Sequence, residues 1–185
     1  MTLTRAELEN AEVESLRPAG PRKPEVMRVR GPGGECVVKD FAAGGRFGRW
    51  LGRWLIAREV RAYERLADHP AVPRVLGRID AMAFAVEYRP GQIMGPRLAG
   101  RVPEGFIASL REAVDEMHAR GVVHLDLRHR SNVLAGETGE PVLIDFASAL
   151  CFRPAGPAAR LLLPLLAWID RRAVEKWGRQ LQQSS

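Results

Sequence analysis

The stretch HLDLRHRSN (residues 124–132), followed by IDF (144–146), decides the fold expected for this chain. Each string comes after an apolar run typical of a β-strand. Directly upstream, residues 105–120 carry a single apolar stripe at helical spacing, closed by Gly121 as a helix stop. Either string alone occurs by chance in many soluble proteins. Their order and their context therefore favour one functional loop system over coincidence.

In this order the two strings resemble the catalytic motifs of the protein kinase-like superfamily, H-R-D-x-x-x-x-N followed by D-F-G. The resemblance implies that Asp126 orients the attacking hydroxyl, while Asn132 and Asp145 hold Mg²⁺ on the phosphates of ATP. It also implies that His124 supports the backbone of the loop rather than transferring a proton. The implied activity is an ATP-dependent kinase.

Two features depart from the kinase pattern. Residues 127–131 place five residues between Asp126 and Asn132, where the motif has four. Either the loop bulges and Asn132 still reaches the metal, or Ser131 takes its place. Ala147 stands where the glycine of D-F-G is expected, which removes a flexible hinge but not the metal ligand.

Lys39 ends the run Val37-Val38-Lys39, which resembles the kinase strand whose lysine contacts the α- and β-phosphates. Glu59 lies inside a helical apolar stripe, where an unpaired carboxylate would be costly, so Lys39 is its expected partner. Glu64 is the competing choice but lies off that stripe.

The phosphate-binding and adenine-binding segments are less regular. No G-x-G-x-x-G precedes Lys39, so residues 19–24 are expected to cover the phosphates, by the charge of Arg22 and Lys23 beside Gly20. VEYRPG (86–91) resembles a kinase hinge, a resemblance that implies adenine binding by three residues: Glu87, Tyr88 and Arg89.

The resemblance covers roughly residues 37–147 and is similar to the compact RIO and lipopolysaccharide-core (Kdo/heptose) kinase branches. No A-P-E follows Asp145, so a conventional activation loop is not expected. The predicted fold is α+β, two-lobed and kinase-like with a trimmed C-lobe. One domain (1–185) is expected, comprising an irregular segment (1–24), a β-rich N-lobe with one helix (about 25–89) and a mainly helical C-lobe (about 90–185).

Periodicity and turn residues predict the individual elements. Strands are expected at 26–30, 36–41, 75–79, 81–88, 133–134 and 142–144, and helices at 47–66, 105–120 and 158–181.

Composition limits the partners and the compartment. The net charge of +6 attracts anionic partners, but no RNA-binding signature is present, so no specific nucleic acid is expected. Two cysteines without C-x-x-C spacing, together with a charged start that lacks a signal peptide, predict a cytoplasmic protein. The longest apolar stretch, 161–169, is too short to span a bilayer.

Several functional readings stay open at this point. The acceptor hydroxyl belongs either to a protein Ser/Thr or to a sugar of a lipopolysaccharide-type glycan. The chain could instead be a pseudokinase that binds nucleotide without turnover. A third reading places it peripherally at the inner face of the cell membrane, through arginines interleaved with aromatic residues: Arg46, Phe47, Arg49, Trp50, Arg53 and Trp54.

Overall fold

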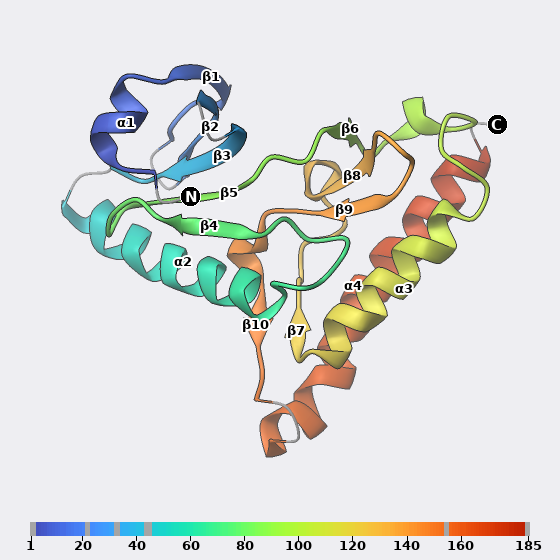
Figure 1. Cartoon of the computed structure of the whole chain (residues 1–185). Helices are drawn as coiled ribbons and strands as arrows, with labels where there is room; N and C mark the ends of the chain where they lie inside the picture. Colours follow the sequence, from blue (N-terminus) through green and yellow to red (C-terminus); the bar gives the residue numbers. More distant parts are fainter. Residues whose placement is uncertain (1–2, 21–22, 32–33, 43–45, 154–155, 184–185) are drawn as a thin grey trace. The chain divides into compact units, whose positions relative to one another are not determined.

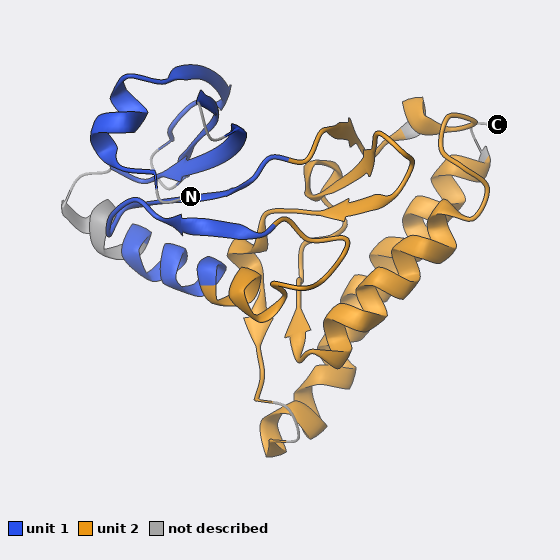
Figure 2. Ribbon diagram, in the orientation of Figure 1, with its two compact units in different colours: residues 1–60, 74–88 blue, residues 61–73, 89–185 orange. Residues whose placement is uncertain are grey.

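The structure is a computed structural model that describes residues 3–20, 23–31, 34–42, 46–153 and 156–183, without the side chains of 46–51, 96 and 183. The chain divides into two compact units (Figure 2). Unit 1 comprises residues 1–60 and 74–88, and unit 2 comprises residues 61–73 and 89–185.

Unit 1 is built on a five-stranded antiparallel sheet in the order β1-β2-β3-β5-β4 (Figure 1). Its strands are β1 (Glu12–Arg17), β2 (Glu25–Gly31), β3 (Gly34–Asp40), β4 (Val75–Arg78) and β5 (Ala83–Glu87). The predicted hairpin at 26–41 is confirmed as β2 and β3, and the predicted strands at 75–88 are confirmed as β4 and β5.

Residues 5–17 are more ordered than the sequence predicts. Helix α1 (Arg5–Glu9) begins with a capping box in which Thr4 and Glu7 satisfy each other's backbone N–H groups. Leu8 packs from α1 into the core formed on one face of the sheet. β1 escapes detection from sequence because its side chains are exposed almost without alternation. The expectation of an irregular segment is therefore wrong for residues 5–17.

Helix α2 (Arg46–Arg65) matches the predicted helix at 47–66 and is the element that runs from unit 1 into unit 2. Its buried stripe contains Ile56, Glu59, Tyr63 and, one residue past its end, Leu66. The spacing of three and four residues keeps these side chains on one face, as predicted.

Unit 2 is mainly helical, with α3 and α4 side by side (Figure 1). Its elements are β6 (Gly91–Ile93), η1 (Pro96–Leu98), α3 (Phe106–Ala119), β7 (Val122–Val123), η2 (Arg130–Asn132), β8 (Val133–Gly136), β9 (Pro141–Leu143), η3 (Phe146–Ser148), β10 (Leu150–Cys151) and α4 (Pro157–Gln183). Both predicted helices and the β8–β9 hairpin are confirmed. The short strands β6, β7 and β10 were not predicted, because two or three residues carry no periodicity.

Gly121 ends α3 in the left-handed region, with a φ of 77° and its N–H donated to the His118 carbonyl. A Cβ at this position would lie 2.7 Å from the Phe152 carbonyl oxygen. We expect Gly121→Ala to lower the free energy of unfolding by about 2 kcal/mol or more, because left-handed strain and a backbone clash add.

Gly105, at the other end of α3, is the matched control. Its φ is 88°, but nothing lies within 4 Å of an added Cβ. Gly105→Ala should therefore cost only the conformational strain of about 1 kcal/mol. Equal losses of stability in urea unfolding of the two variants would contradict this account of Gly121.

Candidate active site

The first cluster of predicted residues lies in unit 1, on β3 and α2. Lys39 Nζ and Glu59 Oε1 form an ion pair at 2.5 Å, with the two residues 5% and 1% exposed. Glu64 is exposed, so it does not compete for the lysine. The ion pair expected from the sequence is thus present. A buried pair recovers little free energy once both charges lose their water, which makes a purely stabilising role a weak explanation for it.

The turn between β1 and β2 is the segment from which phosphate contacts were expected. Gly20 and Lys23 exchange backbone hydrogen bonds of 3.0 and 3.3 Å. Those bonds occupy the N–H groups of both residues, and Arg22 lies outside the described residues. Gly31 and Gly34 lie instead at the β2–β3 turn, where they form the last pair of the hairpin.

The expected hinge residues are Glu87, the last residue of β5, and the two residues that follow it. The Glu87 N–H donates to the Arg74 carbonyl at 2.8 Å, and the Tyr88 ring lies 4.0 Å under the Arg28 guanidinium. In unit 2, Arg89 Nη1 donates to the Pro70 carbonyl at 2.8 Å. These contacts fix the segment, and its adenine-binding role stays a prediction.

The second cluster lies in unit 2, in the loop after β7. Asn132 Nδ2 donates to the Asp126 backbone carbonyl at 3.0 Å and to Asp126 Oδ2 at 3.1 Å. Ser131 is exposed, and its hydroxyl donates to Asn132 Oδ1. A turn closed by the His129 N–H on the Asp126 carbonyl, followed by η2, takes up the additional residue. Of the two alternatives for the metal ligand, the structure brings Asn132, not Ser131, against Asp126.

Asp145 follows β9 and is linked to the same loop. The N–H of its neighbour Ile144 donates to the Asn132 carbonyl at 3.0 Å. Asp145 itself has a φ of 65°, unusual for a residue other than glycine, and its N–H donates to the Tyr63 hydroxyl at 3.2 Å. The strained backbone is thereby held by a contact from α2.

Phe146 and His124 form the buried support of both loops. The Phe146 ring packs edge-on against the Tyr63 ring, with their centres 4.9 Å apart. It lies tilted against the His124 ring, with their centres 4.7 Å apart. Burial lowers the pKa of His124, so its ring is neutral near pH 7. Its Nε2 donates to the Ile144 carbonyl at 3.0 Å, and its Nδ1 accepts the Asp126 N–H at 3.3 Å. His124 therefore supports the backbone, as the sequence led us to expect.

Sequence analysis missed the residue that anchors this loop from α4. Asp170 is fully buried, and its carboxylate accepts the N–H groups of His124 and Leu125, each at 2.8 Å. The same carboxylate accepts His118 Nε2 at 3.0 Å. Leu125 has a φ of 69°, a conformation that costs a branched residue about 1–2 kcal/mol. The Asp170 carboxylate holds that strained turn in place.

Two turns further along α4, Trp177 Nε1 donates to the Leu127 carbonyl at 2.9 Å. The loop is thus fixed on both sides of Asp126. The signal for Asp170 was available in the sequence, because a lone aspartate interrupts the apolar stripe that contains Ala167, Val174 and Trp177.

Comparison with solved structures gives the fold. The Rio2 kinase of Chaetomium thermophilum matches with a TM-score of 0.65 and 18% identity, covering 95% of this chain and 59% of that one. Its ADP/Mg²⁺-phosphoaspartate complex matches with a TM-score of 0.63 and 18% identity, covering 92% and 57%. The chain has a protein kinase-like fold, similar to that of the RIO kinases.

Sequence comparison also finds protein kinases. Serine/threonine-protein kinase WAG2 of Arabidopsis thaliana is 33% identical over 99 residues, which is 48% of this chain. Calcium-dependent protein kinase 9 of Oryza sativa subsp. japonica is 33% identical over 110 residues, or 54% of this chain. The chain spans 20% and 19% of the length of these two relatives. No protein-family model matches the chain.

Within the kinase-like fold, the oxygen donors suit magnesium. Asn132 Oδ1 and the Asp145 carboxylate are hard ligands of the kind that Mg²⁺ takes beside substrate phosphates. Among the described residues no group of three or more His, Cys, Asp or Glu side chains could hold a metal ion by itself. The two donors, Asn132 and Asp145, therefore fit a metal ion whose other ligands include phosphate oxygens.

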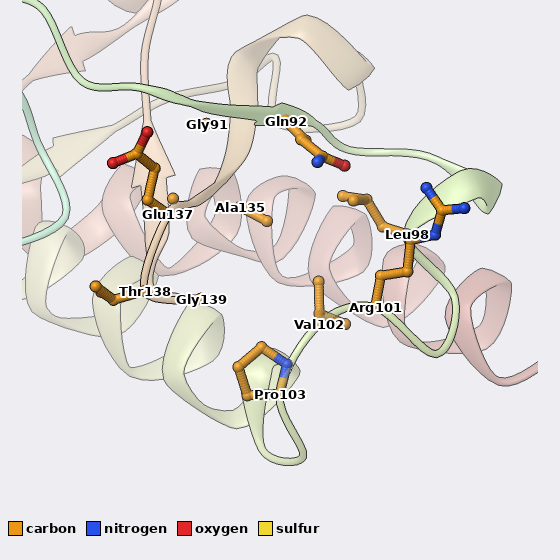
Figure 3. Close-up of a pocket in the computed structure, with 11 residues that line it drawn as sticks. Gly91, Gln92, Leu98, Arg101, Val102, Pro103, Ala135, Glu137, Thr138 and Gly139 are labelled. Atoms are coloured by element: carbon orange, nitrogen blue, oxygen red, sulfur yellow. The ribbon is translucent and has the colours of Figure 1, made fainter.

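The kinase-like fold also has an open pocket of about 550 Å³ in unit 2 (Figure 3). It lies between η1 and the β8–β9 turn, with Gln92, Arg101, Glu137 and Thr138 among its lining residues. None of the residues predicted for catalysis or metal binding lines it.

Proposed function

We propose that this chain is an ATP-dependent phosphotransferase that transfers the γ-phosphoryl group to a hydroxyl. The observation that carries the proposal is the linked set of Asp126, Asn132 and Asp145. Asn132 bonds to the Asp126 side chain, and its backbone carbonyl bonds to the residue before Asp145. A carboxylate for the acceptor and two oxygen ligands for the metal are what phosphoryl transfer requires.

Each residue then has a separate task. Asp126 orients the acceptor hydroxyl and accepts its proton, while Asn132 and Asp145 hold Mg²⁺. Held by these two residues, Mg²⁺ would supply neutralisation of the charge on the transferred phosphoryl group. Lys39 contacts the α- and β-phosphates, and Glu59 keeps its ammonium group in position through the ion pair.

Nucleotide contacts outside this set come from two segments. Because the N–H groups of Gly20 and Lys23 each donate to the other residue's backbone carbonyl, phosphate contact at the β1–β2 turn comes from side-chain charge, that of Lys23 and Arg22. Backbone groups of Glu87, Tyr88 and Arg89 bind the adenine.

We propose a protein Ser/Thr hydroxyl as the acceptor. The relative WAG2 is named a serine/threonine-protein kinase and the second relative a calcium-dependent protein kinase, which supports this choice over a sugar of a lipopolysaccharide-type glycan. Arg128, His129 and Arg130 are exposed beside Asp126 and favour an acidic acceptor. Only residues 146–156 separate Asp145 from α4, which leaves little chain for regulation by a phosphorylated activation loop.

One observation favours a second candidate, a pseudokinase that binds nucleotide without turnover. Two backbone N–H groups of the β1–β2 turn donate to carbonyls of the same turn, so fewer remain to hold the phosphates than in a glycine-rich loop.

Nucleotide binding by titration calorimetry tests the metal assignment. We expect ATP to bind more tightly with Mg²⁺ than without it, and Asp145→Asn to lose that difference while its weaker metal-free binding remains. An Asp145→Asn protein whose affinity still rises with Mg²⁺ would overturn the assignment. Phosphoryl transfer to a mixed acidic Ser/Thr peptide library, compared with lipopolysaccharide, identifies the acceptor class.

A further inference from the structure

The beginning of α4 is apolar and uncovered. Residues 157–169 read PAARLLLPLLAWI, with Arg160 as the one charged residue. None of the side chains at 157–166 is buried, and the buried positions of α4 begin at Ala167. Leu161 is 75% exposed, Leu165 68% and Trp168 56%.

The length of α3 explains why this part is uncovered. The 27 residues of α4 span about 40 Å, whereas the 14 residues of α3 span about 21 Å. Among the described residues, the first side chains of α4 that form polar contacts with α3 are Asp170 and Arg171. Figure 1 shows the first turns of α4 extending past the end of α3 where β7 begins.

The exposed residues form a stripe. At 100° per residue, Leu161, Leu165 and Trp168 point the same way, with Leu162 and Ile169 on the flank, opposite the side that buries Asp170 and Trp177. A stripe this wide and this apolar is ordinarily covered in a folded protein.

The exposed charges among the described residues from 153 to 174 are all basic, and the first exposed carboxylate after them is Glu175, three residues past Arg172. Arg153, Arg160 and Arg172 are exposed, and the Arg172 guanidinium lies 4.4 Å from the centre of the Trp168 ring. The one acidic residue between 153 and 174 is Asp170, which is buried. An occupant with negative charge beside an apolar interior complements this surface.

We propose that the first turns of α4 dock on an anionic phospholipid surface, lying in the plane of the interface with Leu161, Leu165 and Trp168 among the acyl chains. A segment of thirteen residues with a single charge suits the interface and is too short to cross a bilayer. Consistently, no helix in the described part of the chain is long and apolar enough to span a membrane. The arginines lie at head-group level.

A second copy of the chain fits this surface less well. Packing two such stripes together would bring Arg160 and Arg172 near their counterparts, and the exposed carboxylate of Glu175 lies beyond the apolar residues of the stripe. Lipid docking is also independent of phosphoryl transfer, since none of the residues in the stripe belongs to the proposed active site.

The α2 segment with Arg53 and Trp54 is the competing membrane site. It also supplies a matched control, because Trp54 is 51% exposed and lies 5.2 Å from the Arg58 guanidinium, much as Trp168 lies under Arg172. The side chains of Arg46, Phe47, Arg49 and Trp50 lie outside the described residues.

Co-sedimentation of the whole chain with vesicles tests the proposal, using phosphatidylcholine alone and phosphatidylcholine mixed with phosphatidylglycerol. We expect binding to the mixed vesicles that weakens with salt. Leu165→Gln combined with Trp168→Ala should lower the partition coefficient about tenfold or more, while Trp54→Ala leaves it within about twofold. All the substituted side chains are exposed, so circular dichroism should be unchanged.

Three outcomes would overturn lipid docking through α4. These are failure of the parent protein to bind mixed vesicles, binding of the α4 variant equal to that of the parent, and a larger loss from Trp54→Ala than from the α4 variant. Light scattering adds a fourth: a dimer that the α4 variant dissociates, without vesicle binding, assigns the stripe to a second copy. ATP turnover without vesicles should be the same in parent and variant, so failure here is separable from failure of the proposed function.

Discussion

Asp126→Asn is expected to lower the rate of phosphoryl transfer by about 10²- to 10⁴-fold while leaving nucleotide affinity nearly unchanged. The amide has the size of the carboxylate but cannot accept the proton of the acceptor hydroxyl. The bond from Asn132 Nδ2 to the Asp126 backbone carbonyl does not involve the substituted group, so the loop keeps its shape. Single-turnover transfer of labelled phosphate, beside calorimetric titration with nucleotide, measures both quantities.

Ser131→Ala is the control for this variant. Ser131 is exposed in the same loop and was the alternative metal ligand, but the structure turns Asn132 toward Asp126 instead. We expect Ser131→Ala to change the rate by less than about tenfold, the scale of one lost neutral hydrogen bond. A larger loss from Ser131→Ala than from Asp126→Asn would reverse the assignment.

Asp170→Asn is expected to destabilise the protein by about 3 kcal/mol, and with it the turn at Leu125. The amide can accept from one of the two backbone N–H groups, so a buried donor is left facing another donor. For a chain of this length that loss corresponds to a fall in thermal midpoint of about 6–12 °C. Transfer should also slow well below the unfolding transition, because Leu125 can then leave its left-handed conformation and shift Asp126.

Asp115→Asn provides the matched control on the same pair of helices. Asp115 forms an exposed ion pair with Arg171 at 3.0 Å, which is worth at most about 1 kcal/mol. Differential scanning calorimetry of the two variants distinguishes an anchoring role from a surface contact. Similar midpoints for Asp170→Asn and Asp115→Asn would remove Asp170 from the account of the loop.

The same physical argument that predicted the partner of Glu59 could have found Asp170. In both cases one carboxylate interrupts an apolar helical stripe, where it must be compensated. Lys39 could be predicted as the partner of Glu59 because it ends a predicted strand and precedes Glu59 in the order that the kinase motifs have. Asp170 has one side-chain partner, His118, but the partners that matter for the loop are the backbone N–H groups of His124 and Leu125, and backbone groups leave no trace in the sequence.

Other parts of the fold could not be predicted from periodicity or motifs in the sequence. β7 and β10 pair through two residues each, too few for a period of two to appear. The additional residue between Asp126 and Asn132 could be counted in the sequence, but its accommodation by η2 depends on hydrogen bonds within the loop. α1 was readable from its capping box, Thr4 with Glu7, which the sequence analysis overlooked.

The most direct test of the proposed activity is magnesium-dependent turnover of ATP by the purified chain, followed as release or transfer of the γ-phosphate. We predict turnover in the parent that EDTA abolishes. We also predict that turnover falls by about 10²-fold or more in Asp145→Asn, because the phosphates lose their metal. A parent that binds nucleotide without turning it over would contradict the proposed activity and favour the pseudokinase. Unchanged turnover in Asp145→Asn would contradict the assignment of the site.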